Sequence, residues 1–119
     1  MRDEARQPWR PVDRGLWIRN DTAQPPPSRQ VVSLSGEIRL RSVRGLAETL
    51  EDMVAAGTDW LVLDMARVDS LDPGALRALA VVAHELESRG GRLQVRHSRD
   101  MTGRSLEMVG LGRLLMHDD

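Results

Sequence analysis

The pattern of apolar and polar positions along this chain predicts strands that alternate with helices. Leu16–Arg19 and Val31–Gly36 are short apolar stretches of the kind that form strands, and Arg92–Arg96 alternates with Leu93 and Val95 on one side. Trp60–Met65 is an almost unbroken apolar run, typical of a strand in a parallel ladder or one covered on both faces. We therefore expect four strands.

Apolar residues at helical spacing predict three helices in the remaining chain. The first is expected to be capped by Ser42 and to end near Gly57, and the second to run from Pro73 to about Arg89, before Gly90-Gly91. The third is expected from about Met101 to Val109. The order β-β-α-β-α-β-α predicts an α/β fold with a mixed β-sheet and parallel crossovers.

The chain has room for one domain only. Residues 1–14 are polar and contain Pro8 and Pro11, so we expect a flexible N-terminal arm before a domain over residues 15–117. Asn20–Gln30 contains three consecutive prolines and is expected to be an extended connection. The N-terminus has no apolar segment of the signal-peptide type, and we expect a cytoplasmic protein.

Composition excludes several classes of function. The formal net charge of the 119-residue chain is -1, which predicts no general attraction to nucleic acid. No stretch approaches the length of apolar sequence that a membrane span needs. Cysteine is absent, and the three histidines lie on three different predicted elements, so we expect no metal site and no cofactor. No nucleophile is paired with a base by spacing, so we expect no enzyme and no catalytic residues.

The start of the second helix is the strongest candidate site. Asp72 is a good N-cap residue, and Pro73 suits the first helical position. Gly36-Glu37 ends the strand that precedes the first helix, and it is the second candidate. Both patterns are equally typical of ordinary turns and caps, so the residues alone leave the two interpretations open.

Five segments in order resemble the STAS domain family, the anti-sigma factor antagonists and their relatives. They are Val32–Ile38, Leu61–Met65, Val68–Asp72, Gly90–Leu93 and Val109–Leu111. The resemblance covers about Gly15 to Met116. It implies a mixed sheet of four or five strands with helices packed on it, and a protein-binding module. Family members of the antagonist type bind a GHKL-type anti-sigma serine kinase, which phosphorylates them near the start of the second helix.

The chain departs from the family pattern at that helix start. The family has Asp-Ser-Ser-Gly-Leu or a close variant, and this chain has Asp72-Pro73-Gly74-Ala75-Leu76. Gly74 therefore stands at the phosphoacceptor position without a hydroxyl, and Ser70 is the candidate for a displaced phosphosite. Arg39 stands where members often have Asp. The resemblance implies a partner-binding set of Glu37, Arg39, Ser70, Asp72, Pro73, Gly74, Ala75 and Arg77.

The resemblance leaves other functions open. Some STAS domains are subunits of lipid-transport ABC complexes or of stressosome-like assemblies. A small-ligand or nucleotide sensor is a further alternative, because a helix N-terminus favours anions. The partner and the oligomeric state, including a homodimer, stay undetermined at this stage.

Overall fold

The computed structural model describes residues 8–21, 29–98, 100–108 and 110–115. Its strands are β1 (Arg10–Asp13), β2 (Leu16–Asn20), β3 (Arg29–Ile38), β4 (Trp60–Leu71) and β5 (Arg92–Arg96). Its helices are α1 (Val43–Ala55), α2 (Pro73–Glu87) and α3 (Asp100–Met108), with short 3-10 helices η2 (Leu40–Ser42) and η3 (Gly112–Leu114). The predicted α/β class is confirmed.

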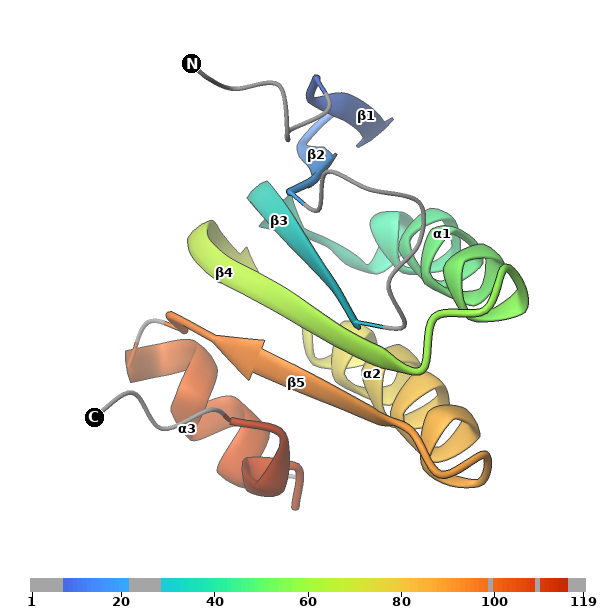
Figure 1. Cartoon of the computed structure of the whole chain (residues 1–119). Helices are drawn as coiled ribbons and strands as arrows, with labels where there is room; N and C mark the ends of the chain where they lie inside the picture. The colour runs from blue at the N-terminus through green and yellow to red at the C-terminus, as the bar shows by residue number, and fades with distance from the viewer. Residues whose placement is uncertain (1–7, 22–28, 99, 109, 116–119) are drawn as a thin grey trace.

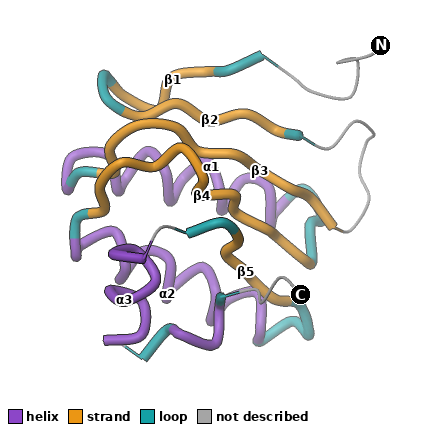
Figure 2. The backbone as a smooth tube through the Cα atoms, turned by 90° about the vertical axis from the view of Figure 1, so that its left-hand side faces the viewer, coloured by secondary structure: helices purple, strands orange, loops and turns teal. Residues whose placement is uncertain are grey.

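The five strands form one mixed sheet in the order β1-β2-β3-β4-β5. The first three pair antiparallel, whereas β3, β4 and β5 pair in parallel through the crossovers made by α1 and α2. These two helices lie side by side on one side of the sheet, and α3 lies beside the β5 edge (Figure 1). Figure 2 shows the strands following one another in chain order from the edge near the N-terminus. The predicted parallel crossovers are therefore present.

Alternation along the strands explains where the core forms. The side chains that face α1 and α2 are aliphatic on every central strand, and they are almost fully buried: Leu16, Ile18, Val32, Leu34, Leu61, Leu63, Met65, Leu93 and Val95. Helix α1 adds Leu46, Leu50 and Val54, and α2 adds Leu79, Val82, Ala83 and Leu86. The core contains no aromatic ring, since the chain has neither Phe nor Tyr and no Trp belongs to the cluster.

The prediction of a flexible arm over residues 1–14 is wrong for Arg10–Asp13, which form β1 and pair with β2. The observed order is therefore β-β-β-α-β-α-β-α, with one strand more at the N-terminus. Residues 10–13 contain Pro11 and show no alternation of apolar and polar residues, so the pattern did not predict a strand there. An edge strand nevertheless tolerates proline and needs only one apolar face. Residues 1–7 and Val109, at the end of the predicted third helix, lie outside the described residues.

The hydroxyl of Ser42 has a different role from the predicted one. It makes no capping hydrogen bond to α1. Instead it donates to Asp13 Oδ2 at 2.6 Å, although the two residues lie 29 positions apart. Asp13 Oδ1 also accepts from the Gly15 N–H at 2.9 Å. One carboxylate therefore ties the β1–β2 turn to the residue before α1.

Gly57 ends α1 as predicted. Its φ is +114°, in the region that favours glycine. The Gly57 N–H donates to Val54 O and the Thr58 N–H donates to Met53 O, both at 3.1 Å. This is the hydrogen-bond pattern of a Schellman C-cap.

We predict that Asp13→Asn destabilises the protein in a pH-dependent way. The Ser42 hydroxyl and then the Gly15 N–H hold the pKa of Asp13 below its ordinary value of 3.8. A lowered folded pKa stabilises the fold above pH 3.8, and this contribution is lost as pH falls through the folded value. Urea unfolding should show a loss of about 1–2 kcal/mol at pH 7 and a smaller loss at pH 3.

The matched control for this variant is Asp59→Asn. Asp59 is exposed, so we expect the free energy of unfolding of Asp59→Asn to equal that of the parent protein at both pH values. An equal loss for Asp13→Asn at pH 7 and pH 3 would contradict the role of its charge.

Candidate functional site

The two predicted segments meet at the C-terminal ends of β3 and β4. The parallel register pairs Glu37 with Ser70 and Ile38 with Leu71. One further hydrogen bond follows the ladder, from the Asp72 N–H to Ile38 O at 2.7 Å. The start of α2 therefore lies directly beside the segment that leads from β3 into η2.

Gly36 permits a close approach that sets the position of Glu37. Its φ is +113°, and a Cβ there would lie 2.1 Å from the carbonyl oxygen of Gly15, in the turn just before β2. The Glu37 N–H donates to that same oxygen at 2.8 Å. A register shift at Gly36/Glu37 then turns the end of β3 against β4. A side chain at position 36 would push these strands apart.

Asp72 caps α2 as the sequence predicts. It has extended backbone angles, φ −70° and ψ 138°, and its Oδ1 accepts from the Gly74 N–H at 2.7 Å. Pro73 is the first helical residue, where its missing N–H costs nothing. The carboxylate thus occupies the position at the helix N-terminus that an external anion would otherwise take.

Gly74 lies under an exposed leucine. A Cβ built on Gly74 would be 2.8 Å from Leu40 Cδ1 and 3.1 Å from Asp72 Oδ1. Leu40 is the first residue of η2. It is 67% exposed, which is unusual for a large apolar side chain. A small residue at position 74 therefore lets Leu40 lie across the start of α2.

Charged side chains surround the start of α2. Arg39 Nε donates to Glu37 Oε1 at 2.6 Å, and Arg41 lies 4.0 Å from Asp13. Arg77 is exposed on α2, one turn after Gly74. We define the α2-start surface as Glu37, Arg39, Leu40, Pro73, Gly74 and Arg77.

The remaining predicted residues divide into two cases. Ser70 is exposed on β4, so its hydroxyl is accessible. Ala75 is fully buried, so its side chain is not available to a partner. Leu40 was missed, because its spacing before Val43 is that of a core position in the first helix.

Among the described residues no group of three or more His, Asp or Glu side chains is placed to hold a metal ion. Asp64 on β4 lies 3.1 Å from His97 Nδ1 and 3.2 Å from Arg96 Nε. Partial burial acts to raise the pKa of Asp64, but the Ala66 N–H, His97 and Arg96 outweigh it and lower that pKa. This carboxylate stays charged and holds the β4 and β5 ends together.

No helix in the described part of the chain is long and apolar enough to span a membrane. A family model described as "Mlab, STAS domain" matches residues 22–116. Because this match spans most of the sequence, the chain belongs to the STAS domain family.

Solved structures with the same fold include anti-sigma factor antagonists. One from Mycobacterium paratuberculosis is 26% identical, with a TM-score of 0.69, over 85% of this chain and 86% of that one. Unphosphorylated SpoIIAA, also an anti-sigma factor antagonist, is 18% identical with a TM-score of 0.69, over 76% of this chain and 80% of its own. The phosphorylated Bacillus SpoIIAA is 16% identical with a TM-score of 0.66, over 81% and 87%. The SpoIIAA likenesses show the fold alone. No curated protein matches this chain.

We predict that Asp72→Ala lowers the free energy of unfolding by about 1 kcal/mol, because the first turn of α2 loses its capping acceptor. Asp72→Asn keeps a capping oxygen and should stay within a few tenths of a kcal/mol of the parent. Urea unfolding at pH 7 compares the three proteins. Equal stability of Asp72→Ala and the parent would contradict the cap.

Proposed function

We propose that this STAS domain is an anti-sigma factor antagonist that binds a GHKL-type anti-sigma kinase through its α2-start surface. It acts in the cytoplasm as a binding module and not as an enzyme. Family membership and the likeness to named anti-sigma factor antagonists support the class. The kinase, the contact residues and the mode of regulation are parts of the proposal.

The observation that carries the proposal is the glycine at position 74. Phosphoryl transfer to a protein needs a side-chain hydroxyl as the attacking group, and Gly74 and Pro73 have none. In a phosphorylated relative the new group brings a charge of about −1.5 to −2, which repels a docked partner. Here the Asp72 carboxylate already caps the helix, and no such group forms at position 74. Binding is therefore not ended by phosphorylation at this position.

The chemistry of the surface favours an acidic partner with an apolar recess. Arg39 and Arg77 on this surface are exposed, and so are Arg41 in η2 and Arg44 at the start of α1. Leu40 offers an apolar side chain that is free to enter a pocket, as central anchors of interfaces do. Charges at the rim then steer the encounter, and Leu40 contributes to the lifetime of the complex.

The test measures binding to purified GHKL-type kinases of the source organism by calorimetry. We expect a specific complex, and Leu40→Ala should weaken it at least about tenfold, as loss of an interface anchor does. Met108→Ala is the matched control, because Met108 is 86% exposed on α3 and lies outside the α2-start surface. Its affinity should equal that of the parent.

Two outcomes would contradict the proposal. One is the absence of binding to every such kinase tested. The other is capture of an ABC-transporter subunit or a stressosome-like shell as the stable partner, which would establish the alternative STAS assemblies. Equal affinity of Leu40→Ala and the parent would show that the α2-start surface is not part of the interface.

A further inference from the structure

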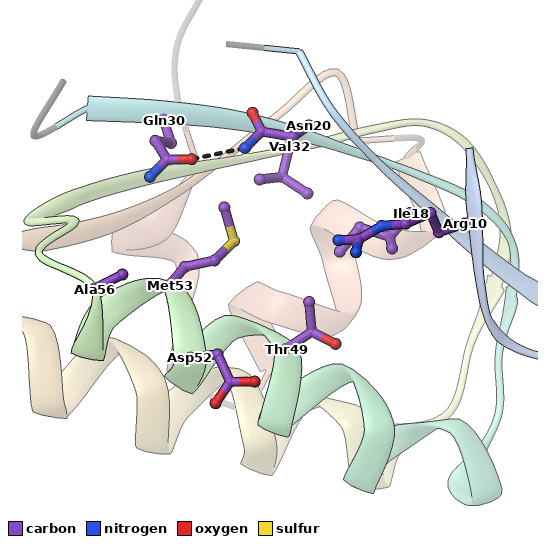
Figure 3. A pocket seen from close by; sticks show the side chains of 9 residues that line it. All are labelled: Arg10, Ile18, Asn20, Gln30, Val32, Thr49, Asp52, Met53 and Ala56. Atoms are coloured by element: carbon purple, nitrogen blue, oxygen red, sulfur yellow. Dashed lines mark hydrogen bonds between the residues drawn. The ribbon is translucent and has the colours of Figure 1, made fainter. Parts of the chain in front are cut away.

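A cavity of about 440 Å³ lies between α1 and the antiparallel part of the sheet (Figure 3). Small-molecule sites in proteins commonly enclose about 300–1,000 Å³. The cavity lies by Gln30, at the start of β3, whereas the α2-start surface lies beyond Ile38, at the end of that strand. Ile18, in the cavity wall, pairs with Leu34, four residues before Ile38, so at about 3.3 Å per residue the near end of the cavity is roughly 13 Å from that strand end. The two sites are therefore distinct.

Short or flexible side chains on α1 leave this space open. Thr49, Met53 and Ala56 recur at helical spacing on the side of α1 that faces the strands, and Ile18 and Val32 line the opposite wall. Figure 3 shows the Met53 side chain pointing from the helix toward Val32. The core contains no aromatic ring that would fill the gap. The result is a partly open cavity with mixed polar and apolar walls, in which the flexible Met53 side chain adapts to apolar groups of varied shape.

Two amides stand where the strand pattern calls for apolar residues. Leu16 and Ile18 are followed on the same side of β2 by Asn20, and Val32 and Leu34 are preceded on β3 by Gln30. Gln30 is 8% exposed, and its Oε1 accepts from Asn20 Nδ2 at 2.7 Å. Its own Nε2 donates to the Thr58 hydroxyl. Buried polar groups are costly unless they are held in this way. The pair places fixed polar groups in the cavity wall, and groups of this kind orient ligands in small-molecule sites.

Arg10 supplies a positive charge to the same cavity. The sheet register places Arg10 beside Ile18, and Figure 3 shows its guanidinium extending from β1 toward the cavity. No described carboxylate lies within ion-pair distance of it. Asp52 also lines the rim, but Figure 3 shows its carboxylate directed away from the strands. A ligand would therefore meet apolar walls, two amides and one available cation.

We infer that this cavity binds a small amphipathic organic anion. Its apolar body packs on Ile18, Val32 and Met53, and its carboxylate, sulfonate or phosphate ester pairs with Arg10. Polar atoms of the body meet Asn20 and Gln30. The inference does not depend on the proposed function, because no residue of the α2-start surface lines the cavity.

The test uses 1-anilinonaphthalene-8-sulfonate, an apolar fluorophore with one negative charge, titrated into the native protein. We expect saturable binding of one molecule per chain. Arg10→Gln should weaken this binding about tenfold, whereas Arg14→Gln, in the adjacent exposed turn, should leave it unchanged. The uncharged analogue N-phenyl-1-naphthylamine should bind about tenfold more weakly than the sulfonate. Equal affinity of the two probes would overturn the assignment of an anion site.

A substitution that fills the cavity provides a second, independent test. Thr49→Leu adds volume on the cavity side of α1 and should abolish binding, while Thr49→Ser leaves the space open and should retain it. Unfolding curves verify that both variants fold. Unchanged binding to a folded Thr49→Leu protein would overturn the assignment. So would the absence of saturable binding to the parent.

Methyl spectra of isoleucine-labelled protein locate the probe directly. The chain has only two isoleucines, Ile18 in the cavity wall and Ile38 beside the start of α2. We expect the Ile18 δ1-methyl signal to shift with the probe while the Ile38 signal stays in place. A shift confined to Ile38 would place the probe at the α2-start surface and overturn the assignment. Kinase binding is measured without the probe, so failure of either proposal is recognised separately.

Discussion

The parallel pairing of β3 with β4, extended by the hydrogen bond from Asp72 to Ile38, is the constraint on which the site depends. It brings the end of one strand and the start of α2 to the same edge of the sheet. In the sequence, η2 and α2 are separated by the whole of α1 and β4. Gly36 is required for the same reason, because only a residue without a side chain lets β2 approach β3 at that point.

A rigid helix start and a missing hydroxyl then act together. Asp72 satisfies the first turn of α2 with its own carboxylate, so the helix needs no bound anion to be stable. Gly74 costs some helix propensity, up to about 1 kcal/mol relative to alanine in a helix interior and less at an end. In exchange, Leu40 lies across the helix start and stays exposed to a partner. The absence of a phosphoacceptor that we propose for position 74 is thus compatible with the proposed docking surface.

Periodicity predicted much of this fold, since four strands, the α2 cap at Asp72 and the α1 end at Gly57 depend on residues close in sequence. What it missed depends on residues that are distant. Strand β1 pairs with β2, and its last residue, Asp13, accepts a hydrogen bond from Ser42, a contact that no local pattern encodes. The exposure of Leu40 and the cavity beside Met53 depend on how helices lie against the sheet. Asn20 and Gln30 did carry a signal, because both interrupt an apolar stripe, but a strand end gives the same pattern.

The central claim is that the α2-start surface binds a kinase and offers that kinase no acceptor to phosphorylate. The most direct measurement incubates the preformed complex with ATP and follows intact mass together with size-exclusion elution. The parent protein is predicted to keep its mass and stay in the complex, while Gly74→Ser gains one phosphate and is released. Phosphate on the parent protein, at Ser70 or any other residue, with loss of the complex would contradict the claim.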